Sequence, residues 1–265
     1  MSGPASHPTG GASSCAGADV DPSAIADCLS SVLARLTWES DGVAEVTARA
    51  TRLLLPALTT LAALRPHLGT WDGIVHRRCR LVPLSGSGEG ARSGGGQRRR
   101  GGGETDGVDS RPAWLPAARG WRTLTVSLVD GGIEATHWLA RHDGGAEART
   151  ATASPSAPPL SGADAGEQEL LLTPAELAAW ARATGDRNAL HLVPGAAARA
   201  GLEAGEADVV AHGTLLAALS LAVAPAQRVD LPFLAPAVVP PGGLRLRLEP
   251  HGDVLSGGGV LLRRR

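Results

Sequence analysis

The chain has 265 residues, of which 43% are apolar, and its 25 basic and 26 acidic side chains leave a net charge of −1. This length and apolar fraction suffice for one large or two small globular domains with a buried core. A charge so close to zero argues against a general electrostatic affinity for nucleic acid or acidic membranes, so we expect neither as a partner.

The N-terminal part of the chain combines polar and apolar segments. Residues 1–23 lack the basic start and apolar core of a signal peptide, so we interpret them as a disordered tail. A short helix is expected over 24–36. Alternation predicts a strand at 43–55, and apolar spacing predicts a helix at 55–69. Residues 73–84 are predicted to form a strand ending near a proline.

The middle of the chain contains two segments that cannot form a core. Residues 85–107 are rich in Gly, Ser and Arg and are interpreted as an inserted loop. Residues 150–167 are rich in Pro, Ser, Ala and Gly and are interpreted as a linker. Between them, 121–130 and 132–141 predict a β-hairpin.

The cysteines and two of the histidines give no metal signature. Cys15, Cys28 and Cys79 have no metal-ligand spacing, and an odd number of cysteines suits a reducing compartment. With no signal peptide and no apolar stretch of about 18 residues, we expect a cytoplasmic protein. His76 and His137 are expected to be packing or surface side chains, and no metal or redox cofactor is expected.

The sequence TPAEL is typical of a helix start. Thr173 is the expected N-cap, Pro174 occupies the first helical position, and Glu176 can reach back as a capping box. The helix is predicted to run to about Ala183, with Trp180 anchoring it in the core.

The C-terminal part of the chain predicts a buried helix followed by strands. The helix spans about 213–224. A strand broken by prolines is expected in 229–243, and the segments 244–250 and 259–265 are expected to be closing strands.

The segment TGDRNALHLVP at 184–194 places a carboxylate, an amide and an imidazole within six residues. On a helix, Asp186 and His191 would point about 140° apart, so cooperation between them requires a turn, which Gly185 and Asn188 favour. Such a loop can direct both groups to one point, as acid–base catalysis requires, with Asn188 as a positioning residue. Alternatively, these residues are a helix cap, an Asx-turn and an ordinary half-buried histidine.

A second segment, VVAHGTLLAAL at 209–219, opens the apolar helix at Gly213. Helix N-termini offer unpaired N–H groups and a favourable dipole to developing negative charge, so this glycine is a candidate oxyanion donor. His212, just before it, is assigned with Asn188 to the substrate site, with packing as its alternative role.

The two segments together resemble the MaoC-like family, the (R)-specific enoyl-CoA hydratases or type 2 hydroxyacyl-thioester dehydratases. GDRNALH resembles the GDxNPxH signature of this family, and VAHGTLL resembles its second signature. The resemblance implies an α+β hot-dog fold, in which a curved antiparallel sheet wraps a long helix. It also implies that Asp186 and His191 are the catalytic pair and that the Gly213 N–H binds the thioester oxygen. The chain departs from the family pattern at Ala189, usually proline, and at Val193, usually aspartate.

A weak internal repeat relates 60–68 to 215–223, and the arrangement resembles double hot-dog dehydratases. We therefore predict a degenerate N-terminal half, 24–149, and a catalytic half, 168–265. Because no second GDxNxxH motif occurs in the first half, we expect one active site per chain, with the first half forming a wall of the acyl pocket.

The function implied by this resemblance is reversible hydration or dehydration of 2-enoyl and (R)-3-hydroxyacyl thioesters, carried by coenzyme A or by acyl carrier protein. Two alternatives remain: a hot-dog thioesterase and a catalytically inactive binding or structural subunit. A homodimer is a possible assembly.

Overall fold

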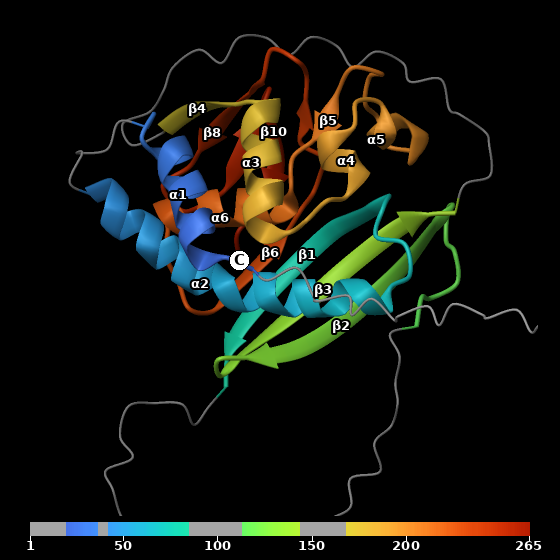
Figure 1. The fold of residues 1–265 in the computed structure, drawn as a ribbon, viewed down its shortest axis with the longest axis horizontal. Coiled ribbons are helices and arrows are strands. Elements are labelled where there is room, and N and C mark those ends of the chain that lie inside the picture. The colour runs from blue at the N-terminus through green and yellow to red at the C-terminus, as the bar shows by residue number, and fades with distance from the viewer. Residues whose placement is uncertain (1–19, 37–41, 85–112, 144–167) are drawn as a thin grey trace, which may run out of the picture.

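The computed structural model describes residues 20–36, 42–84, 113–143 and 168–265 (Figure 1). The predicted insertion 85–107, the linker 150–167 and residues 1–19 of the predicted tail lie outside the described residues.

Runs of helices and runs of strands follow one another along the described chain. The helices are α1 (Pro22–Leu33), α2 (Gly42–Leu64), the 3-10 helix η1 (Arg65–His67), α3 (Pro174–Thr184), α4 (Ala189–Leu192), α5 (Ala196–Arg199) and α6 (Gly213–Val223). The strands are β1 (Ile74–Pro83), β2 (Trp121–Asp130), β3 (Ile133–His142), β4 (Gln168–Leu172), β5 (Val209–Val210), β6 (Val229–Pro232), β7 (Val238–Val239), β8 (Leu244–Leu248), β9 (Val254–Ser256) and β10 (Gly259–Leu262). Within the described residues, no helix has both the length and the apolar character needed to cross a membrane.

Two four-stranded antiparallel sheets form the β layer. Their orders are β2-β3-β1-β6 and β10-β9-β8-β4. The edge strands β6 and β10 meet, because Phe233 pairs with Leu262 and the Asp230 N–H donates to the Arg265 carbonyl. The two sheets are therefore joined through β6, which comes from the C-terminal part of the chain but completes the sheet of the N-terminal strands.

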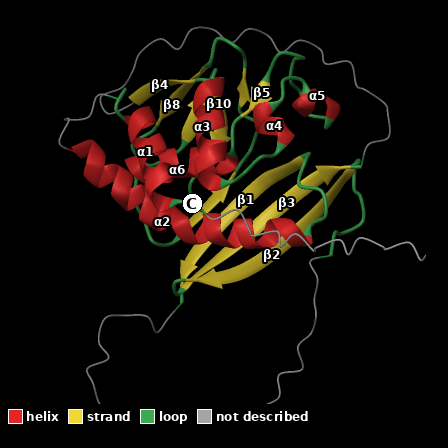
Figure 2. Ribbon diagram, viewed as in Figure 1, coloured by secondary structure: helices red, strands yellow, loops and turns green. Residues whose placement is uncertain are grey.

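The helices α2 and α6 pack against each other in the core. α2 contacts α6 and also lies along β2 and β3 (Figure 2). Nine consecutive residues of α6, 214–222, are buried, and α6 also packs against β8 and β9. This pattern of two sheets and two central helices agrees with the hot-dog architecture expected from the sequence.

The strand predicted at 43–55 is wrong, because these residues form the first half of α2. The buried side chains Val46, Ala50, Leu54 and Leu58 follow a spacing of four residues, which places them on one helical face. This spacing continues into the segment that was predicted to be helical. Extending an existing helix costs less free energy than starting one, so the whole region becomes one helix.

Most other local predictions are confirmed. β2 and β3 form the predicted hairpin, and β1 ends at Pro83. Glu176 accepts hydrogen bonds from the Thr173 N–H and hydroxyl, 2.7 and 2.9 Å long, at the predicted start of α3, and the Trp180 side chain is fully buried. α1 begins at Pro22, two residues before the predicted start, because its cap is Asp21.

Candidate active site

The loop that carries the first motif starts where α3 ends. Gly185 caps α3 with φ of 65°, a left-handed conformation that favours glycine. The buried Asp186 follows, and Asn188 then caps the short helix α4, which carries His191. The expected turn is therefore present, and it leads into a helical turn, as the alternative of a helix cap predicts, although the cap is Asn188 and not Asp186.

Asp186 lies among polar groups from both parts of the chain. Its Oδ1 accepts a hydrogen bond of 2.6 Å from the Trp71 indole N–H, and its Oδ2 lies 3.8 Å from the Arg65 guanidinium. Burial by itself raises the pKa of the Asp186 carboxyl, whereas the imidazoles of His191 and His212, the guanidinium and the indole lower it. The resulting pKa is about 2, so the carboxylate is ionised at neutral pH.

Asn188 connects the loop to the N-terminal part of the chain by hydrogen bonds. Its amide Nδ2 donates to the Ile74 carbonyl at 2.8 Å, and its Oδ1 accepts from the backbone N–H groups of Gly73 and Leu190, at 3.2 and 3.1 Å. The side chain is 1% exposed. These contacts give Asn188 the geometry of a positioning residue, and its contact with substrate stays a prediction.

A hydrogen bond to the backbone holds the His191 ring in one orientation. Its Nδ1 lies 2.6 Å from the Val210 carbonyl oxygen, which can only accept, so Nδ1 carries the proton. Burial lowers the pKa of His191, although Asp186 opposes this shift. The imidazole is therefore neutral at pH 7, and its Nε2 is a free proton acceptor.

His212 stacks on His191, with ring centroids 3.7 Å apart and an interplanar angle of 27°. It is 1% exposed, and neither ring nitrogen makes a hydrogen bond of normal geometry within the described residues. Burial and the neighbouring His191 hold the pKa of His212 well below its usual value. A neutral, stacked imidazole supports the packing role, and a substrate contact by His212 stays a prediction.

Gly213 is the first residue of α6, and its N–H is one of the helix-terminal donors that have no partner within the helix. The glycine also allows the Phe233 ring to pack closely against the start of α6, because a Cβ atom at this position would lie 3.2 Å from the ring.

A cavity of about 50 Å³ brings the main groups together. Asp186, His191 and Gly213 all line it, whereas Asn188 and His212 do not. Leu61, Trp71 and His76 line the same cavity from the N-terminal part of the chain. This volume holds water but is smaller than the 300–1,000 Å³ typical of ligand pockets.

The contacts of Arg65 and Trp71 with Asp186 were not predicted from the sequence. Neither residue belongs to a motif, and both lie more than 110 positions before Asp186 in the chain. The signal in the sequence that points to Arg65 is its place at the end of a strongly apolar helix, where a buried cation needs a carboxylate partner.

Two groups of side chains have the residue types and spacing of metal ligands. Each residue of the set Asp186, His191 and His212 offers one ligand atom, and these atoms lie within 4.8 Å of one another. The same holds for His76, Cys79 and His137.

Solved structures with a similar fold give an independent comparison. A MaoC-like dehydratase superposes with a TM-score of 0.51 at 14% sequence identity, and the match covers 92% of each chain. The chain has the hot-dog fold of a MaoC-like dehydratase. The fold predicted from the two motifs is thereby confirmed.

Two further structures match with lower TM-scores. HtdX of Mycobacterium tuberculosis matches with a TM-score of 0.49 at 18% identity, covering 93% of this chain and 89% of HtdX. A MaoC-like dehydratase from Phytophthora capsici matches with a TM-score of 0.47 at 10% identity, covering 91% of this chain and 89% of that protein. At the level of sequence, no family model and no curated protein matches this chain.

Proposed function

We propose that this chain is a MaoC-like hydro-lyase that adds water to 2-enoyl thioesters and removes it from (R)-3-hydroxyacyl thioesters. The observation that supports the proposal is the meeting of Asp186, His191 and Gly213 at one cavity. A carboxylate, a neutral imidazole and a helix-terminal N–H are the groups that this reaction needs.

The first step is the placement of one water molecule. The carboxylate of Asp186 and the Nε2 of His191 are both acceptors, so they can each take one hydrogen of the same water. A ligand atom of each side chain lies within 4.8 Å of the other, a gap that one bridging water spans. The water oxygen is then free to attack the β-carbon.

The second step is the transfer of protons. With a pKa of about 2, the Asp186 carboxylate is a weak base, so we assign the proton to His191 and give Asp186 the role of stabilising the imidazolium. As the oxygen–carbon bond forms at the β-carbon, the electron pair of the double bond moves toward the thioester carbonyl. The imidazolium then returns the proton to the α-carbon, so one water is consumed and His191 is neutral again.

The enolate formed between these steps needs stabilisation. The Gly213 N–H is the proposed donor to the thioester oxygen, and such a donor contributes about 2.7–4 kcal/mol to a transition state. The cavity of about 50 Å³ admits the water but not an acyl chain, so substrate binding requires the surrounding side chains to move.

We propose that the carrier of the thioester binds on the surface side of Trp71, away from the inner cavity. This residue lines the inner cavity and also a surface groove of about 440 Å³, whose other lining residues are Arg65, Asp72, Gly185 and Arg187. Guanidinium groups bind phosphates well, so the groove suits the anionic part of coenzyme A. Arg187→Ala is expected to raise KM for a coenzyme A thioester more than for the matching pantetheine thioester, which lacks the nucleotide phosphates.

The deciding experiment is hydration of crotonyl-CoA by the full chain, followed as the loss of absorbance of the conjugated thioester. Turnover that is abolished in His191→Ala supports the lyase. Release of free thiol points to the alternative thioesterase, and no reaction with a folded protein points to an inactive subunit. Each of the last two results contradicts the proposal.

A further inference from the structure

A β-bulge in β1 brings two ligand-type side chains to the same face of the sheet. In a regular strand, His76 and Cys79 would point to opposite faces, because side chains alternate. The pairing of β1 with β3 shifts register between His76 and Arg78, so one extra residue is inserted there. As a result His76 lies opposite Leu139 and Cys79 lies opposite His137, and both partners are on the inner face of β3.

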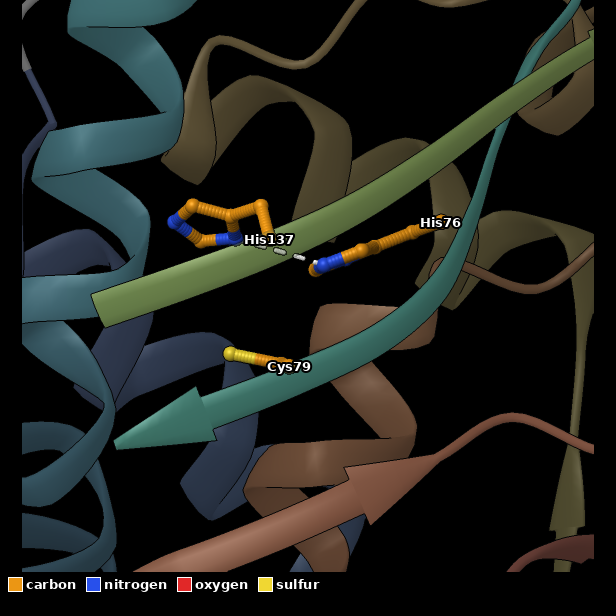
Figure 3. A group of neighbouring side chains, drawn as sticks. All are labelled: His76, Cys79 and His137. Carbon is orange, nitrogen blue, oxygen red and sulfur yellow. Dashed lines mark hydrogen bonds between the residues drawn. The ribbon is translucent and has the colours of Figure 1, made fainter. Parts of the chain in front are cut away.

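The three side chains are close enough to share one ion. Figure 3 shows His76 and Cys79 on β1 and His137 on the neighbouring β3. The His76 Nε2 lies 3.3 Å from the His137 Nδ1, and one ligand atom from each of the three side chains lies within 4.8 Å of the others. Zn–N bonds of about 2.0–2.1 Å in a tetrahedral site put two nitrogens about 3.3–3.4 Å apart, which agrees with the observed separation.

Thr60 holds the His137 ring in the orientation that a ligand needs. The Thr60 hydroxyl donates to the Pro56 carbonyl at 2.7 Å, so it accepts from the His137 Nε2–H, 2.9 Å away. This leaves the His137 Nδ1 without a proton, so it accepts the 3.3 Å hydrogen bond from the His76 Nε2–H when no metal is bound. Metal-binding histidines generally donate their other N–H to a neighbouring acceptor in this way.

The remaining atoms of the cluster lack competing partners. The His76 Nδ1 is buried and makes no hydrogen bond of normal geometry within the described residues. Cys79 is 1% exposed, and burial, followed by the Asp230 charge, raises the pKa of its thiol to about 12. The thiol is therefore neutral when no metal is bound.

We propose that His76, Cys79 and His137 form a Zn²⁺-binding site inside the fold. The ligand atoms are the His76 Nε2, the Cys79 Sγ and the His137 Nδ1. On binding, the thiol loses its proton to solvent and forms the Zn–S bond, and the proton on the His76 Nε2 moves to the Nδ1. Because His76 also lines the cavity, a water molecule there can supply the fourth ligand.

The test uses Co²⁺ as a spectroscopic substitute for Zn²⁺. The full chain is stripped with a chelator, and Co²⁺ is then titrated while the thiolate-to-cobalt charge-transfer band is recorded. One Co²⁺ per chain and displacement by Zn²⁺ are expected. The other possible metal set, with Asp186, His191 and His212, contains no sulfur and cannot give this band.

Matched variants assign the band to this cluster. Cys79→Ala is expected to abolish it, whereas Cys28→Ser, on α1, is expected to leave it unchanged. Thr60→Val keeps the shape of the side chain and all three ligands, and it is expected to weaken metal binding about 10- to 100-fold. No charge-transfer band in the folded wild-type chain, or an unchanged band in Cys79→Ala, overturns the proposal.

Discussion

The indole Nε1 of Trp71 donates a 2.6 Å hydrogen bond to the Oδ1 of Asp186, across 115 positions of sequence. This contact connects the end of the N-terminal helical segment to the loop of the first motif. It gives the half without a catalytic signature a direct influence on the charge of the proposed catalytic carboxylate.

Asp186→Asn removes that charge while keeping the size of the side chain. We expect kcat for crotonyl-CoA hydration to fall about 100-fold or more, because a neutral amide no longer stabilises the His191 imidazolium and electrostatic stabilisation of a transition state contributes about 10²–10³-fold. Trp71→Phe keeps the carboxylate but removes one charged hydrogen bond, so a smaller loss is expected together with a raised pKa of Asp186. Full activity in Asp186→Asn would contradict the assigned role.

Gly213→Ala tests the start of α6. The added Cβ would lie 3.2 Å from the Phe233 ring, so the ring or the helix start must shift by a few tenths of an ångström. We expect kcat to fall more than KM rises, because the N–H would move away from the developing oxyanion. The double variant Gly213→Ala with Phe233→Leu removes the clash. Recovery of kcat in that variant identifies steric displacement as the cause.

Buried histidines predict a loss of stability in acid. The pKa of His212 lies well below its usual value of 6.5 in the folded chain, so below about pH 6.5 the unfolded chain binds a proton that the folded chain does not. The free energy of unfolding is therefore expected to decrease as the pH falls below 6.5. Asp186 does not contribute in the upper part of this range, because its pKa is lowered from 3.8 to about 2 and its stabilising effect is lost only as the pH falls through these two values.

Urea unfolding at a series of pH values measures this slope. His212→Phe keeps a flat ring on His191 and has no ring nitrogens to protonate, so its slope should be shallower than that of the wild type. His67→Gln, on the surface, serves as the control. The activity of His212→Phe also separates the two roles of this residue, because a packing residue tolerates the change and a substrate contact does not.

Ala189 stands where the related motif usually has proline, and its contacts suggest a reason. Its N–H donates to the Asp72 carboxylate at 2.9 Å, and proline has no N–H to donate. The residue is the first of α4, a position where proline otherwise fits well. In an Asp72→Ala background, Ala189→Pro is therefore expected to stabilise the chain by about 0.4–1 kcal/mol.

The same substitution in the wild type should stabilise less or destabilise, because it breaks the bond to Asp72. The free energies of unfolding of the four chains in this double-mutant cycle give the coupling directly. Equal effects of Ala189→Pro in both backgrounds would show that the hydrogen bond contributes nothing.

The sequence predicted the features that depend on near neighbours. The cap at Thr173, the hairpin of β2 and β3 and the start of α6 at Gly213 follow from turn chemistry and apolar spacing over a few residues. The two motifs also led to the cavity shared by Asp186 and His191.

Features that depend on distant contacts could not be predicted. The alternation in 43–55 fits a strand locally, and only packing against α6 and the sheet selects the helix. Arg65 carries no motif, and its approach to Asp186 depends on the fold of the whole chain. The bulge in β1 likewise cannot be predicted from the sequence, because only the pairing with β3 shows that Arg77 is the extra residue.

The insertion of β6 between β1 and β10 limits how this chain can be divided. A fragment that ends before residue 168 would keep β3 beside β1 but leave the other edge of β1 without β6, and the complementary fragment would present β6 as an open edge. Neither piece is therefore an independent folding unit, and genetic separation of the two halves should give aggregation-prone products unless they are produced together.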